Sequence, residues 1–139
     1  MEELVEWYGQ QLDEDERIAR AAAEPEEWVE LNRAPQLSWS VELWADPDCA
    51  AVVAEESSAY PVVVTTQGMS DADAEARVAH IVAHDPARVL REIDAKRRII
   101  GRINSHAAVM GRDEIHDDLL RSLALPYADR PGYKESWRP

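Results

Sequence analysis

Apolar and polar positions alternate over the first 24 residues with the period of an amphipathic helix. Apolar side chains recur every three or four residues, at Leu4, Val5, Tyr8, Leu12, Ile18, Ala19 and Ala22. The opposite positions are mostly acidic, and acids in a first turn favour a helix because they lie at the positive end of its dipole. Pro25 interrupts the pattern, so we predict a helix that ends near residue 23.

Residues 27–68 have the pattern of β-strands. Apolar and polar side chains alternate from Trp39 to Trp44, and further runs of β-forming residues follow at 51–53 and 61–66. Turn-forming residues separate these runs. The region predicts three short antiparallel strands whose apolar face needs helices to cover it.

A helical pattern returns at Ser70, which with Asp73 has the spacing of a helix-capping pair. Asp85-Pro86 predicts the start of a second helix, because Asp is a favoured N-cap and Pro fits the first helical position. A third helix is predicted over 113–125, before Pro126. The apolar positions expected on the buried faces are Ala74, Val78, Ile81, Val82, Val89, Leu90, Ile93, Ile100, Ile103, Ile115, Leu119, Leu120 and Leu123.

Together these elements predict a single α+β domain with an acidic N-terminal helix, a three-stranded antiparallel sheet and two or three C-terminal helices covering it. Its parts are the acidic helix at 1–24, the β region at 27–68, the helices at 70–125 and a tail at 126–139 that Trp137 anchors. With 45% hydrophobic and 31% charged residues, the composition is that of a globular protein. A three-stranded sheet has edges to protect, so a homodimer is a further expectation.

The net charge of −13 lies entirely in residues 1–58, which hold 16 Asp and Glu against 3 Arg. Residues 59–139 hold 12 acidic and 12 basic residues. This asymmetry predicts an acidic surface that binds a basic protein partner; the alternative is a solvated face that keeps the chain soluble. The predicted partner-binding residues are Asp13, Glu14, Glu16, Glu24 and Glu27.

The lone cysteine, Cys49, cannot form an internal disulfide or supply the paired thiolates of a zinc ribbon. The N-terminal segment lacks the basic and apolar regions of a signal peptide, and no apolar stretch reaches the roughly 18 residues of a membrane span. We therefore expect a cytoplasmic protein that does not contact membranes.

His80 and His84 stand four residues apart on one predicted helix, a spacing that lets two imidazoles reach one metal ion. Asp73 falls on the same face and completes a candidate site for a divalent metal. Arg77 also lies on this face and opposes a cation there, and no HExxH motif is present. The ordinary interpretation is a solvated polar face without a cofactor, and the alternative is a metal-binding module or a metal-dependent hydrolase.

Basic residues follow the helix predicted over 86–105. Arg91, Arg98 and Arg102 share one face, which could contact phosphates. The net charge of −13 disfavours a nucleic-acid partner, and the ordinary interpretation is that this helix lies near the acidic N-terminal helix. Nucleic-acid binding is the third functional hypothesis.

No catalytic or nucleotide-binding motif occurs in the sequence. The patterns GxSxG, GxxxxGK[ST] and GxGxxG are all missing, and five glycines leave little material for a phosphate-binding loop. We therefore predict a non-enzymatic interaction protein.

Two segments of the chain are similar to a known family. They are AHIVAHDPARVL at 79–90, continuing to residue 100, and LALPYAD at 123–129 with the tail to Pro139. With LDEDE at 12–16 they resemble a family of small actinobacterial and actinophage proteins, domain of unknown function 6221, over about half the chain. The resemblance implies a lineage, including a phage-derived or accessory role, but no activity. It also implies a zinc-binding Cys/His insertion in other members, where this chain has only His106 and His116.

Overall fold

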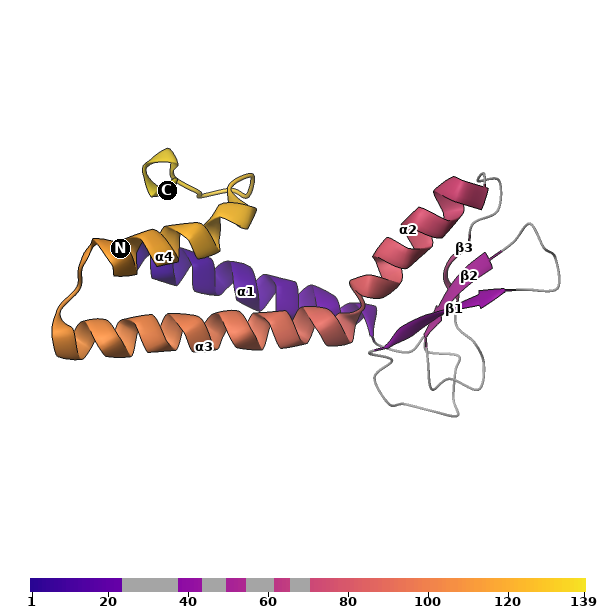
Figure 1. The fold of residues 1–139 in the computed structure, drawn as a ribbon, viewed down its shortest axis with the longest axis horizontal. Helices are drawn as coiled ribbons and strands as arrows, with labels where there is room; N and C mark the ends of the chain where they lie inside the picture. The colour runs from indigo at the N-terminus through magenta and orange to yellow at the C-terminus, as the bar shows by residue number, and fades with distance from the viewer. Residues whose placement is uncertain (24–37, 44–49, 55–61, 66–70) are drawn as a thin grey trace. The chain divides into compact units, whose positions relative to one another are not determined.

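A computed structural model describes the chain in five stretches (Figure 1). The described residues are 1–23, 38–43, 50–54, 62–65 and 71–139. They form two compact units, one of Met1–Glu16 with Arg91–Pro139 and one of Arg17–Leu90. We call the first the helical unit and the second the sheet unit, and describe each by itself.

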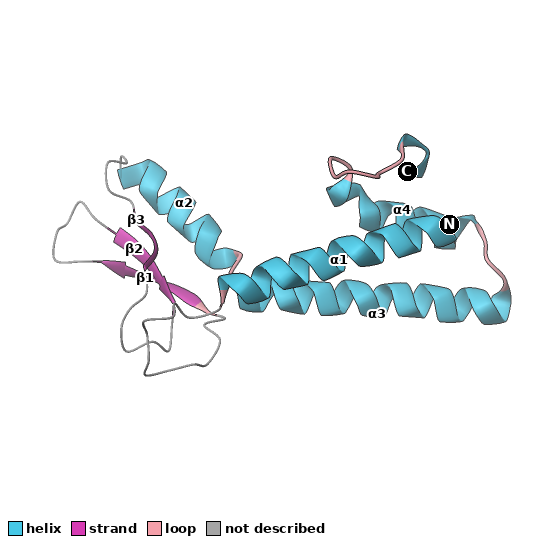
Figure 2. Ribbon diagram, turned by 180° about the vertical axis from the view of Figure 1, so that it is seen from behind, coloured by secondary structure: helices cyan, strands magenta, loops and turns pink. Residues whose placement is uncertain are grey.

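The helical unit is built on two long helices and the C-terminal tail. Its elements are α1 (Glu2–Ala22, through Glu16), α3 (Pro86–Met110, from Arg91), α4 (Glu114–Ala124) and the short 3₁₀ helices Leu125–Tyr127 and Glu135–Trp137. Within this unit α1 and α3 lie side by side, as the views from the front and from behind both show (Figures 1 and 2). The N-terminal helix thus packs against segments about 80 residues away in the sequence.

The apolar stripe of α1 forms much of the core of the helical unit. Leu4, Tyr8 and Leu12 are buried at successive turns. The other helices contribute buried side chains as well, namely Ile93, Ile100, Ile103, Leu120 and Ala124. The predicted end of the first helix is confirmed, because α1 ends at Ala22. Ile18, which the pattern places on the same apolar face, is 50% exposed.

An aromatic cluster fastens the tail to α1. The Trp7 ring lies 5.6 Å from the Tyr133 ring and 5.5 Å from the Trp137 ring. The indole Nε1 of Trp7 also donates a hydrogen bond to the Pro131 carbonyl at 3.0 Å. Trp137 is buried, which confirms its predicted role as the anchor of the tail.

Side-chain caps define where α3 and α4 begin. The Asp85 carboxylate accepts a hydrogen bond from the Arg88 backbone N–H at 2.7 Å, which confirms the helix predicted to start at Pro86. Asp113 and His116 form a reciprocal capping box at the start of α4. The buried face of α4 was predicted only in part: Leu120 is buried as predicted, but Ile115 is 69% exposed and His116 is buried instead.

In its described residues the sheet unit holds three short strands, the helix α2 (Asp71–Ala83), the end of α1 and the start of α3. The strands β1 (Trp39–Leu43), β2 (Ala50–Ala54) and β3 (Val62–Thr65) pair antiparallel in the order β1-β2-β3. In the β1/β2 register Trp39 lies opposite Ala54, and the β2/β3 pairing shifts between Val52 and Val53. Helix α2 packs against β1 and β2, and Val52 and Val78 are buried in this unit.

The α+β fold class predicted from the sequence is wrong, because the described chain is mostly helical. Helices of 21, 13, 25 and 11 residues outweigh strands of 5, 5 and 4 residues. The predicted role of the C-terminal helices is corrected too: the buried residues Ile93, Ile100 and Leu120 belong to the helical unit with α1. Periodicity shows that a helix has a buried face but not which element covers it. The single domain predicted over residues 1–139 stays a prediction.

Candidate functional site

The acidic face of α1 meets a basic side chain of α3. Arg97 donates hydrogen bonds to Asp13 Oδ1 at 2.6 Å and to Glu16 Oε2 at 2.5 Å. These bonds, the Glu16 bond first, raise the pKa of the Arg97 guanidinium above its ordinary value. The prediction that the basic helix lies near the acidic N-terminal helix is therefore confirmed.

Asp15 joins α1 to the C-terminal tail. Its side chain is only 19% exposed and accepts hydrogen bonds from Arg130 Nη2 at 2.5 Å and from the Tyr127 hydroxyl at 2.7 Å. Burial, followed by the bond to Asp15, raises the pKa of the Tyr127 hydroxyl far above its ordinary value. Closer to the N-terminus, Lys134 Nζ lies 2.5 Å from Glu3 Oε1. The tail thus supplies cations to two further acids of α1.

The predicted partner-binding residues are only partly brought together. Asp13 and Glu16 share Arg97, although the Asp13 side chain remains 73% exposed. Glu14 is exposed on the same helix. Glu24 and Glu27 lie outside the described residues. Arg97 therefore already neutralises part of the negative charge that was predicted to attract a basic partner.

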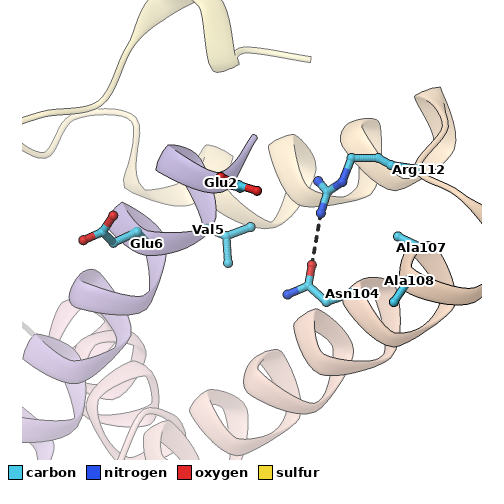
Figure 3. A pocket seen from close by; sticks show the side chains of 7 residues that line it. All are labelled: Glu2, Val5, Glu6, Asn104, Ala107, Ala108 and Arg112. Carbon is cyan, nitrogen blue, oxygen red and sulfur yellow. Dashed lines mark hydrogen bonds between the residues drawn. The ribbon is translucent and has the colours of Figure 1, made fainter.

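A pocket of about 500 Å³ lies between the start of α1 and the end of α3. We call it the N-terminal groove; its lining residues are Glu2, Val5, Glu6, Asn104, Ala107, Ala108 and Arg112. Figure 3 shows Val5 between the two helices, with Glu2 on the side of Arg112 and Glu6 turned away from it. Sequence analysis missed this groove, because no pattern in the chain connects residue 5 with residue 107.

Two glutamates line one side of the groove, and on the other side the positive charge of Arg112 is paired with an acid. Arg112 donates to Asn104 Oδ1 and to Asp117 Oδ1, both at 3.2 Å. Glu2 and Glu6 are exposed, and within the described ranges neither forms an ion pair. The two glutamates therefore make the groove negative beside a floor of Val5 and alanines.

The predicted metal-binding histidines lie close together at the end of α2, with His80 in the helix and His84 directly after its last residue, Ala83. The rings of His80 and His84 are 4.3 Å apart, and His84 Nδ1 donates to the His80 carbonyl at 2.8 Å. This bond leaves only Nε2 of His84 as a metal ligand. Asp73 lies in α2, but its side chain is outside the described part of the structure. Among the residues that the structure describes, no group of three or more His, Cys, Asp or Glu is arranged to hold a metal ion.

The other two histidines form a structural corner between α3 and α4. His106 Nδ1 lies 2.8 Å from His116 Nε2, and His116 is buried. The backbone N–H of Asp113 donates to His116 Nδ1 at 3.2 Å, and the His116 N–H donates to Asp113 Oδ1 at 3.0 Å. The latter bond is the main reason that the pKa of the Asp113 carboxyl is lowered. These histidines cap and pack a helix.

A family model matches the entire sequence. The model of DUF6221, described as a family of unknown function, covers residues 1–139. The chain belongs to DUF6221. The match extends the resemblance carried by HDPARVL and LALPYAD from about half the chain to all of it. No curated protein and no solved structure matches the chain.

Two further features of this DUF6221 chain bear on its partners. Arg91, Arg98 and Arg102 of α3, which were predicted to share one face, are exposed, and Arg98 Nε lies 2.8 Å from Asp94 Oδ2 on the same helix. Across the stretches that the structure describes, no helix combines the length and apolarity needed to cross a membrane.

Proposed function

We propose that this DUF6221 protein is a non-enzymatic module that binds a basic segment of a partner protein through the acidic surface of α1. The observation that carries the proposal is the N-terminal groove, where Glu2 and Glu6 are exposed beside an apolar floor. A docking surface with an apolar centre and charged edges is typical of a specific interface. A partner with Lys or Arg next to an apolar side chain complements this surface.

The start of α1 is favoured over its middle by the cost of exchanging ion pairs. A basic partner that binds Asp13 and Glu16 has to compete with Arg97, which already donates to both. An exposed ion pair is worth only about 0.2–1 kcal/mol, so replacing one such pair with another gains little. At Glu2 and Glu6 a partner cation adds a new interaction. The surface of Asp13, Glu14 and Glu16 then has a secondary role, attracting the partner over a longer distance.

The lone cysteine supports a cytoplasmic setting for this interaction. Attraction between a protein of net charge −13 and a basic partner raises the association rate at low salt. Binding is therefore expected to weaken as the salt concentration rises.

Affinity capture from a lysate of the host, quantified by mass spectrometry, tests the proposal when charge variants are compared. Changing Glu2 and Glu6 to Gln should reduce the recovery of basic partners about tenfold, the effect of losing about 1.4 kcal/mol. Changing Asp13, Glu14 and Glu16 to their amides should reduce it less. Neutralising the exposed Asp118 and Asp129 removes the same number of charges as the Glu2 and Glu6 change and serves as the matched control.

Equal recovery by the Glu2 and Glu6 variant and the wild type would contradict the proposal. An equal loss in the matched control would contradict it as well, because net charge rather than the start of α1 would then determine capture. Circular dichroism of each variant confirms that the exposed substitutions leave the helices intact.

A further inference from the structure

We propose that the occupant of the N-terminal groove is a single amphipathic helix of the partner, which places an apolar side chain against Val5 and Ala107 and basic side chains against Glu2 and Glu6. This inference rests on the proposed function and names the kind of partner segment that its site takes. It follows from the shape of the groove, the apolar surface beside it and the spacing of its acids.

The position and the lining of the groove suit the packing of a third helix. The groove lies between α1 and α3, which run side by side in the helical unit (Figures 2 and 3). Its floor is made of short side chains, with Val5 and Ala107 half-buried and Ala108 exposed. Short side chains allow the backbone of an incoming helix to come within the 8–10 Å that is usual between packed helices. Apolar grooves of this kind receive amphipathic helices in many complexes.

Two exposed apolar side chains lie at the end of α3, next to the groove residues in sequence. Val109 is 83% exposed and Met110 is 71% exposed, and both directly follow the groove residue Ala108. Large apolar side chains left in water at one end of a highly charged protein mark a surface that binding would cover. An occupant with apolar side chains on one face would bury the floor of the groove.

The spacing of the acidic wall matches one turn of a helix. Glu2 and Glu6 are four residues apart on α1, which at 1.5 Å per residue separates them by about 6 Å along the axis. Lys or Arg residues four apart on a second helix have the same separation. On the opposite wall Arg112 is held by Asn104 and Asp117. The wall that lacks an ion pair is therefore acidic, and the complementary helix is basic.

The test is a nuclear magnetic resonance titration of the full chain with synthetic helical peptides. The main probe is an amphipathic peptide of about 14 residues, or four turns, made of Leu and Lys. Two matched peptides differ in one property each: one has Gln for every Lys, and the other has Ser for every Leu. We expect the Leu/Lys peptide to shift the amide signals of Val5, Ala107 and Ala108. Each matched peptide should bind at least about tenfold more weakly.

Variants of the chain locate the binding site. Ala107→Leu fills the floor and should weaken binding of the Leu/Lys peptide about tenfold. Ala95→Leu adds the same side chain at an exposed position of α3 outside the groove and should leave binding unchanged. Changing Glu2 and Glu6 to Gln, both exposed, should weaken binding without affecting the fold.

The outcomes separate this inference from the proposed function. Peptide shifts confined to Asp13, Glu14 and Glu16 would overturn the helix-in-groove inference and the choice of the start of α1, and would leave only the general proposal that acids of α1 bind a basic partner. Equal binding of the Ser-substituted peptide would overturn the helix-in-groove inference, because charge alone would then suffice. Groove shifts that depend on protein concentration without peptide would overturn it in favour of a second copy. No shifts with any peptide at about 1 mM would contradict both proposals.

Discussion

Tyr8 is a buried residue whose ring and hydroxyl have opposite effects on stability. The side chain is 1% exposed, and its ring packs edge-to-face on the Tyr127 ring with centroids 5.3 Å apart. Among the described residues its hydroxyl has no hydrogen-bond partner. Burial, followed by the nearby charge of Asp15, raises the Tyr8 pKa to about 12. The ring therefore stabilises the core, while the hydroxyl carries an uncompensated desolvation cost.

Tyr8→Phe should leave the melting temperature at pH 7 unchanged or raise it, because it keeps the ring and removes the unpaired hydroxyl. The native state holds the Tyr8 proton up to about pH 12, whereas the unfolded chain releases it near pH 10. The contribution of Tyr8 protonation to the free energy of unfolding is therefore fully present below about pH 10, and it is lost as the pH rises from 10 toward 12. Thermal unfolding at pH 7, 9 and 11 should show a smaller alkaline loss in the variant. A melting temperature that drops at pH 7 would contradict this account.

For single residues the sequence predicts burial well over the first half of α1 and poorly at the start of α4. Leu4, Tyr8 and Leu12 are buried as predicted. On α4, however, His116 occupies a buried position and Ile115 does not. The reason is that His116 completes a capping box and contacts His106, and these polar contacts select its place on the helix. Hydrophobic periodicity does not include such contacts.

At the scale of elements, the tail depends on a close approach between Gly132 and α1. Gly132 has a positive φ of 86°, and a Cβ there would lie 2.8 Å from Trp7 Nε1. Gly111, between α3 and α4, has the same φ of 86° but nothing within 4 Å of a Cβ. The two glycines therefore have the same positive φ, which disfavours any residue with a Cβ. They differ only in that Gly132 lies against Trp7.

Gly111→Ala should destabilise the protein by about 1–2 kcal/mol, the cost of a left-handed conformation in a residue with a Cβ. Gly132→Ala should destabilise it more, because Trp7 has to move and its bond to the Pro131 carbonyl is weakened. Denaturant unfolding measures both losses, and tryptophan fluorescence should shift to the red only for Gly132→Ala. Equal losses in the two variants would show that the contact with Trp7 does not hold the tail.

Element boundaries could be predicted where a local chemical marker exists. Asp85 and Pro86 predicted the start of α3, and Pro25 predicted the end of α1. The fold class could not be derived in this way, because it depends on which faces meet. The helices after Pro86 were expected to cover the sheet, yet α3 from Arg91 onward packs in the helical unit with α1.

At the scale of the whole molecule, opposite charges join the two ends of the chain. Residues 1–16 hold seven acidic and no basic residues, and residues 91–139 hold ten Lys and Arg. Ion pairs connect these segments where Arg97, Arg130 and Lys134 meet the acids of α1. Part of the charge asymmetry seen in the sequence is therefore compensated within the fold.

The acidic side of the candidate site could be predicted from the sequence, but its ion pairs and its second wall could not. The acidic character of α1 follows directly from the composition of residues 1–16. Which acids are paired follows from contacts across more than 80 residues, such as that between Asp13 and Arg97. The groove beside Glu2 and Glu6 likewise needs the end of α3 as its second wall.

Carboxyl-group footprinting with mass spectrometry tests the central claim most directly, because it reports the accessibility of each carboxylate in the free protein and in the captured complex. In the free protein we predict that Glu2 and Glu6 react faster than Asp15, which is mostly buried and hydrogen-bonded. In the complex we predict that labelling of Glu2 and Glu6 falls several-fold, while labelling of the exposed Asp118 stays constant. Labelling of Glu2 and Glu6 that is the same with and without the partner would contradict the claim that the start of α1 is the binding surface.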